Sequence, residues 1–132
     1  MIIDLKNVKN VKNIALIGAS PNKEKFGYKI FKDLTKKGYT VYLVNPNHDE
    51  IEGIKTYKSV KELPKEKTDL MVFVIPPQLG IKILKEAYEV GFRKFWFQPG
   101  AESEEIENYL EGLKDVDYSL IKCIMVETSK LL

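Results

Sequence analysis

The chain has 132 residues, of which 44% are hydrophobic and 30% are charged, and this composition excludes a disordered or fibrous protein. Its length predicts a single domain with one hydrophobic core. With 21 basic and 19 acidic residues the net charge is only +2, so the charge gives no indication of nucleic-acid binding.

The first half of the chain alternates between strand and helix signals. A short apolar run over residues 13–19, with charge before it and turn residues after it, predicts a buried parallel strand. Apolar side chains then recur with helical spacing up to Gly38, which stands where a C-terminal helix glycine belongs. A second strand is predicted at 39–46 and a minor one at 54–57. Residues 7–13, ahead of these elements, are interpreted as part of an amphipathic helix.

The second half repeats the alternation. A buried strand is predicted at 69–77, and the helical face that follows it ends at Gly91. After a fourth strand at 93–100, Ser103 is expected to cap a third helix, whose first turn contains glutamates. The remaining extended segments are predicted at residues 117–121, as a last strand, and 123–127, as an edge segment.

Strands that alternate with helices in this way imply right-handed βαβ units. We therefore predict an α/β fold, a single Rossmann-like three-layer domain over residues 1–132, whose mainly parallel sheet has about five strands with helices on both faces. Ligands of such sheets bind outside the carboxyl ends of the strands. Four strand-end loops are rich in glycine, proline, serine and asparagine and are predicted to form a cleft at this edge: residues 18–27, 45–48, 75–78 and 98–102.

The loop after the first strand has features that suit a phosphate group. It leads into a helix N-terminus, where free backbone N–H groups and the helix dipole attract anions. Gly18 permits close approach of the backbone, Ser20 offers a hydroxyl, and Lys23 and Lys25 add positive charge. The alternative is that Ser20 or Asn22 only caps the helix.

The loop differs from the fingerprint of dinucleotide-binding proteins. That fingerprint has three glycines, and an acidic residue about 20 positions further on grips the ribose. Here Gly18 is followed by Ala19 and Ser20, and the second strand ends in Asn45 and Pro46 instead of an acid. NAD(P) binding therefore remains only an alternative.

The sequence offers neither a catalytic constellation nor a metal-ligand cluster, so no catalytic and no metal residue is predicted. His48 is the only histidine, and Cys123, the only cysteine, has no partner for a disulfide, which fits a reducing compartment. The apolar run at 70–75 stops at Pro76, so no membrane span is expected. With no signal peptide evident in residues 1–13, a cytoplasmic location is predicted.

Taken together, the strand-end loops resemble those of a known family. The motifs are GASPN at 18–22, VNP at 44–46 followed by G-x-x-x-Y at 53–57, a strand that ends in Pro-Pro, and W-x-Q-x-G at 96–100. Over roughly residues 10–128 they resemble the single-domain CoA-binding proteins. These are relatives of the CoA-binding N-terminal domain of succinyl-CoA ligase alpha subunits and of ADP-forming acyl-CoA synthetases.

The resemblance implies coenzyme A or an acyl-CoA as the ligand and assigns each loop a part of it. The first loop would approach the phosphates, the second would lie beside the adenosine, the third would form a wall, and the fourth would close over the pantetheine or pyrophosphate. Two residues at the helix start, Phe26 and Gly27, depart from the family pattern of a proline and a small hydroxyl residue. The implied cofactor-binding residues are Gly18, Ala19, Ser20, Lys25, Asn45, Pro46, Asn47, Ile75, Pro76, Gln98 and Pro99.

The function implied is CoA binding without catalysis by the isolated chain. The larger ligases have a second domain with a phosphorylated histidine, for which a chain ending at Leu132 has no room. Three alternatives stay open: a CoA-binding subunit whose catalytic residues come from a partner polypeptide, an NAD(P)-binding redox sensor, and a purely structural interaction domain. The expected partners are the CoA ligand and a protein partner or a second copy, with no nucleic acid and no membrane.

Overall fold

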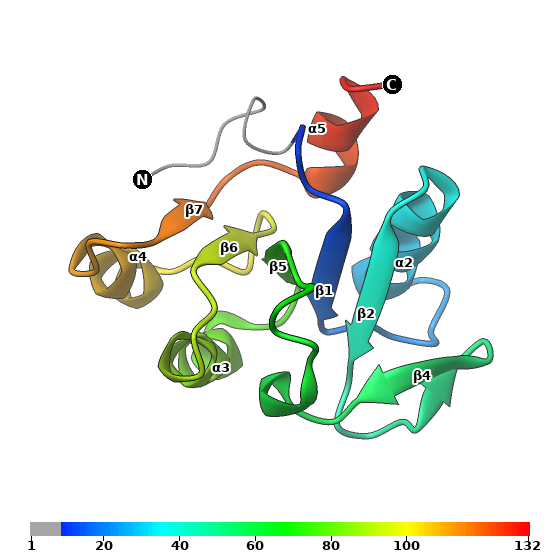
Figure 1. Ribbon diagram of the computed structural model, residues 1–132, viewed down its shortest axis with the longest axis horizontal. Helices are drawn as coiled ribbons and strands as arrows, with labels where there is room; N and C mark the ends of the chain where they lie inside the picture. The colour runs from blue at the N-terminus through cyan, green and yellow to red at the C-terminus, as the bar shows by residue number, and fades with distance from the viewer. Residues whose placement is uncertain (1–8) are drawn as a thin grey trace.

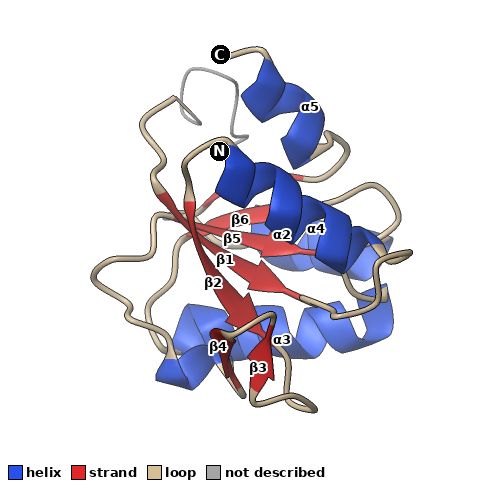
Figure 2. Cartoon of the chain, turned by 90° about the vertical axis from the view of Figure 1, so that its right-hand side faces the viewer, coloured by secondary structure: helices blue, strands red, loops and turns tan. Residues whose placement is uncertain are grey.

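The computed structural model describes residues 9–132, which form a sheet of seven strands between two layers of helices (Figures 1 and 2). The strands are β1 (Asn13–Ile17), β2 (Thr40–Val44), β3 (Glu50–Ile51), β4 (Ile54–Tyr57), β5 (Leu70–Phe73), β6 (Lys94–Phe97) and β7 (Asp117–Ser119). The helices are α2 (Phe26–Lys36), α3 (Pro77–Glu89), α4 (Glu104–Glu111), α5 (Ile124–Ser129) and the 3₁₀ helix η1 (Val60–Glu62).

The strand order in the described sheet is β3-β4-β2-β1-β5-β6-β7. Every neighbouring pair is parallel except β3 and β4, which form an antiparallel hairpin at one edge. From β1 the chain builds the sheet outward through β2 and β4, then crosses back and continues from β5 on the other side of β1. The predicted α/β fold is confirmed, and the β3–β4 hairpin raises the strand number above the expected five.

Alternate residues of the central strands face the two helical layers. In β1, Ile14 and Leu16 pack with the apolar side chains of α2 and α5, whereas Ala15 and Ile17 pack with those of α3 and α4. This alternation follows from the two-residue period of a strand. Because both faces are covered, β5 is buried throughout and β1 from its second residue onward, which explains why they read as continuous apolar runs. No helix in residues 9–132 has the length and apolarity needed to cross a bilayer.

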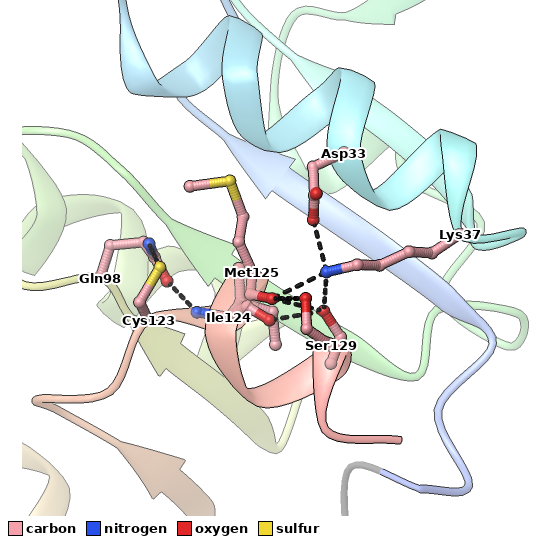
Figure 3. A network of polar contacts seen from close by, with 8 residues as sticks. Asp33, Lys37, Gln98, Cys123, Ile124, Met125 and Ser129 are labelled. Atoms are coloured by element: carbon pink, nitrogen blue, oxygen red, sulfur yellow. Dashed lines mark hydrogen bonds and ion pairs between the residues drawn. The ribbon is translucent and has the colours of Figure 1, made fainter. Parts of the chain in front are cut away.

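The segment after β7 differs from the prediction. Residues 123–127 were expected to be extended along an edge, but this prediction is wrong, because the chain forms α5 there. Ile124 and Thr128, four residues apart, are both buried on the side that packs against the domain. Lys37, just after α2, donates to the Met125 carbonyl at 2.7 Å and the Thr128 hydroxyl at 2.9 Å (Figure 3). Contacts from a distant part of the chain therefore hold this short helix in place.

The predicted amphipathic helix over residues 7–13 begins outside the described residues. Within the described part, residues 9 and 10 form a turn, and Asn13 already pairs with Thr40 as the first residue of β1. The helix prediction is therefore wrong for residues 9–13. The asparagines and lysines that suggested a polar helix face instead lead into the buried strand.

Candidate functional site

A cavity of about 560 Å³ opens at the carboxyl edge of the sheet, where β1 lies between β2 and β5. This is the point at which the strand order reverses, and it is where open parallel sheets bind ligands. The volume falls within the range of small-molecule sites. The walls come from the loops after β1, β2 and β5, from residues 58–60, and from one side of α3.

Gly18, the first residue after β1, lets the loop lie directly against the end of β5. Its φ angle is +103°, which a side chain disfavours. A Cβ atom here would lie 2.6 Å from Cγ2 of Ile75 and 2.7 Å from the carbonyl oxygen of Val74. The loops after β1 and β5, which both line the cavity, can therefore meet only because residue 18 has no side chain.

Gly27 seats the first turn of α2 on the same loop. A Cβ atom at this position would lie 2.1 Å from the carbonyl oxygen of Gly18, which is much shorter than a van der Waals contact. The residue is also buried. The departure from the family pattern at residue 27 thus has a structural reason: in this chain the helix backbone rests on the backbone of the Gly18 loop.

The N-terminus of α2 presents unused donors beside the cavity. Lys25 is the N-cap residue, no side chain caps the helix, and its first turn contains no acidic residue. Within residues 9–132 the N–H groups of Phe26 and Gly27 have no hydrogen-bond acceptor. Among residues 9–132, no side chain therefore caps the positive end of the helix dipole. Since the Lys25 side chain also lines the cavity, this end of the site is electropositive.

Ser20 and Asn22 make hydrogen bonds within the loop. The Ser20 hydroxyl oxygen accepts from the Asn22 N–H at 3.1 Å, and the Asn22 side-chain oxygen accepts from the Glu24 N–H at 3.0 Å. Neither residue caps α2, so the alternative that they serve only as a helix cap is wrong. They instead shape the turn that carries the chain from β1 to the exposed Lys25.

Asn45, at the end of β2, joins two of the loops. Its side-chain amide donates to the carbonyl oxygen of Ala19 at 2.8 Å, and its side-chain oxygen accepts from the Asn47 N–H at 2.7 Å. An aspartate could not make the first of these bonds, because a carboxylate has no N–H to donate. The amide therefore holds the loop after β1 while leaving this side of the cavity without a negative charge.

The remaining charges at the cavity are paired within the protein. The Lys58 ammonium lies 2.7 Å from the Asp49 carboxylate, and this hydrogen bond lowers the pKa of Asp49 below its usual value. On the opposite wall the Glu86 carboxylate of α3 accepts a hydrogen bond from the Ser59 hydroxyl at 3.1 Å. His48 is not part of the lining, and its carbonyl oxygen accepts a hydrogen bond from the Thr56 hydroxyl.

The structure gathers the predicted site residues into this cavity with two exceptions, Gln98 and Pro99. The Gln98 side chain is 5% exposed and turns toward α5, where its oxygen accepts from the Ile124 N–H at 2.7 Å (Figure 3). The same oxygen also accepts from the indole of Trp96 in β6 at 3.1 Å. Its amide donates to the Cys123 sulfur at 3.4 Å. Gln98 thus fastens α5 to the end of β6, and its contact with a ligand stays a prediction, as does that of the exposed Pro99.

Neither Cys123 nor His48 is part of a cluster of potential metal ligands within residues 9–132. Cys123 is a partly buried free thiol next to Gln98. In the part of the chain that the structure describes, no three His, Cys, Asp or Glu side chains gather as they would around a metal ion.

Sequence reasoning missed the part of the cavity that α3 and residues 58–60 provide. Leu79, Ile83 and Glu86 line it from α3, at positions i, i+4 and i+7. This stripe lies beside the core-facing stripe of Ile81 and Leu84 and could have been found as a second helical face. Residues 58–60 gave no comparable signal, because they face the cavity only through the packing of η1 against α3.

Comparison with known proteins finds a family whose model matches most of this chain. The model of a family described as "CoA binding domain" matches residues 12–129. The chain is 44% identical over 85 residues to acetate–CoA ligase (ADP-forming) II subunit alpha of Pyrococcus furiosus. The matched region is 64% of this chain and 18% of the relative. It is 40% identical over 90 residues to acetate–CoA ligase (ADP-forming) of Methanocaldococcus jannaschii, covering 68% of this chain and 13% of the relative. The chain therefore spans less than a fifth of these curated relatives.

Solved structures of similar size share the fold. A conserved hypothetical protein from Pyrococcus furiosus matches with a TM-score of 0.84 and 59% identity, covering 88% of this chain and 98% of that one. A hypothetical protein from Pyrococcus horikoshii matches with a TM-score of 0.87 and 30% identity, covering 97% and 89%. The architecture described here thus also occurs in proteins of nearly the same length.

Proposed function

Because this chain belongs to the family of CoA-binding domains, we propose that it binds coenzyme A or an acyl-CoA in the cleft at the carboxyl edge of the sheet. One observation carries the proposal. The uncapped N-terminus of α2 is seated by Gly27 on the Gly18 loop, and Gly18 and the N-cap residue Lys25 line the same cavity. Such a helix start attracts phosphate groups.

The cavity suggests how the ligand lies. The phosphates take the N–H groups and positive charge at the start of α2, and the adenine lies between the loops of Asn45 and Pro76. Asn45 is important here because CoA carries a phosphate on the ribose, where NAD has a free hydroxyl. A carboxylate at this position, as in NAD-binding folds, would grip a hydroxyl but repel a phosphate.

Isothermal titration calorimetry tests the proposal directly. Purified protein titrated with CoA and with acetyl-CoA is expected to give saturable binding with one ligand per chain, and NAD is expected not to displace it. Native mass spectrometry of freshly purified protein is expected to reveal an adduct with the mass of CoA. The proposal fails if millimolar CoA produces neither heat nor a thermal shift, and displacement by NAD favours the dinucleotide alternative instead.

A second candidate function is a CoA-binding subunit of a ligase with several chains. Its support is the similarity to a relative that is itself named a subunit alpha and of which this chain matches only a small part. In this arrangement another polypeptide provides the catalytic residues. Co-purification of a ligase-like chain that activates acetate in the presence of this protein would support it. The second candidate would be contradicted if the isolated chain binds CoA and no such partner co-purifies with it.

Changing Asn45 to aspartate tests the charge argument. We expect Asn45→Asp to weaken CoA binding on the order of a hundredfold, because it places a negative charge beside the phosphates and removes the donor to Ala19. Calorimetry measures the loss. Asn108→Asp makes the same charge change on the exposed side of α4 and should bind CoA like the unmodified protein. Equal affinities for the two variants would contradict the placement of the phosphates.

A further inference from the structure

The Glu86 carboxylate is an unusual group to find in a cleft that takes an anionic ligand. It lies on the third turn of α3 and lines the same cavity as Lys25. The helix starts at the carboxyl edge and runs back along the sheet, because it connects the parallel strands β5 and β6. Glu86 is therefore about 10 Å further from that edge than Leu79, at 1.5 Å per helical residue. It is the lining residue of α3 that lies farthest from that edge.

The carboxylate is held in position by its neighbours. Its Oε1 accepts the Ser59 hydroxyl at 3.1 Å, and its Oε2 lies 3.9 Å from the Lys61 ammonium. The side chain remains 37% exposed, so it is not sealed in the core. A carboxylate offers about four lone-pair positions, and these contacts leave room for another donor. Ser59 holds one oxygen of a residue that lines the cavity, so the carboxylate is available to a ligand there.

Such a group selects the chemistry of what reaches it. An ionised carboxylate only accepts hydrogen bonds, and it repels phosphate. The ligand must therefore keep its phosphates at the Lys25 end and bring a neutral hydrogen-bond donor to the Glu86 end. The walls between the two ends are largely apolar, with Ile83 and Leu79 from α3 and Val60 from η1. A flat apolar group with a donor on its edge fits this description.

Two parts of CoA are neutral, the adenine and the pantetheine arm, and the adenine fits better. Its exocyclic amine is a donor on the edge of a flat ring. The pantetheine arm also carries donors, two amide N–H groups and a hydroxyl, but these lie on a flexible chain and not on the edge of a flat apolar ring, and the thiol at its end is lost in a thioester. We propose, building on the proposed function, that Glu86 accepts a hydrogen bond from the adenine amine and thereby selects adenine over hypoxanthine.

The test compares CoA with its deaminated analogue, in which hypoxanthine replaces adenine. The analogue has a carbonyl oxygen in place of the amine, so it presents an acceptor to the carboxylate. In calorimetry we expect the unmodified protein to bind CoA about tenfold to a hundredfold more tightly than the analogue. This is the loss of affinity expected when the analogue leaves the Glu86 carboxylate without a hydrogen-bond donor. In Glu86→Gln the side-chain amide can accept from adenine or donate to hypoxanthine. Its preference should therefore fall to within about threefold.

A matched variant separates recognition from a merely structural effect. Glu89→Gln makes the same change at an exposed position on α3 and should keep the full preference for CoA. Comparable affinities of the unmodified protein for CoA and the analogue would overturn the inference. So would a Glu86→Gln variant that weakens both ligands equally, since that result means Glu86 only positions Ser59. An unmodified protein that binds neither ligand refutes the proposed function itself, which is a different result.

Discussion

Gly27→Ala is expected to abolish CoA binding and to destabilise the domain. The new Cβ atom would lie 2.1 Å from the carbonyl oxygen of Gly18, and the atom it meets is backbone, which cannot rotate away. Either α2 moves outward or the loop after β1 does. Overpacking of this kind costs about 1–3 kcal/mol, and more where the surroundings cannot yield. Both movements pull the helix N–H groups away from the loop that borders the cavity.

Gly112→Ala provides the control for this variant. Gly112 ends α4 with a φ of −75°, and a Cβ atom there would meet its nearest neighbour at 3.5 Å, which is ordinary contact. This variant should unfold in urea and bind CoA like the unmodified protein. Calorimetry and urea unfolding are measured on both proteins. If Gly27→Ala binds CoA as tightly as Gly112→Ala does, the packing of α2 on the Gly18 loop does not form the site.

The fold could be predicted because its signals are local. The buried strands β1 and β5 stand out as short apolar runs bounded by polar residues, since helices cover both faces of the sheet. Ser103 is a further example: its hydroxyl accepts from the Ile106 N–H at 3.1 Å, so the predicted cap of α4 is confirmed. The position of the cleft followed in turn, because parallel strands bring their following loops to one edge.

The rest depends on contacts that no local pattern reveals. The residues of α5 include β-branched Ile124 and Val126, which suit a strand as well as a helix. A helix of six residues gains little from propensity, so its packing decides the outcome. Gln98 was expected to contact the ligand because it follows a strand at the carboxyl edge of the sheet. Only the fold shows that α5 passes behind it and occupies its side chain.

Lys37 provides the most direct test of how α5 is held. Its ammonium is buried, with a side-chain exposure of 8%, and it contacts Met125, Thr128 and the Asp33 carboxylate at 2.7–2.9 Å (Figure 3). Lys37→Met keeps the apolar stem but leaves these acceptors unpaired. We expect a loss of about 2–4 kcal/mol in the free energy of unfolding. The upper end of that range is expected because the oxygen of Asp33 that pairs with Lys37, Oδ2, is itself buried, so water cannot readily replace the lost partner.

Hydrogen exchange locates the effect of this variant, and Lys36→Met is its control. Lys36, the residue before Lys37 and the last of α2, is exposed, so its replacement should leave both the urea midpoint and the exchange rates unchanged. In Lys37→Met the amides of α5 should exchange faster than those of β1, because the helix loses its attachment before the sheet opens. The double variant Asp33→Asn with Lys37→Met should recover part of the stability, since it removes the carboxylate left without a partner. Uniform exchange across α5 and β1 would mean that α5 is held by its apolar contacts alone, and that Lys37 contributes only to global stability.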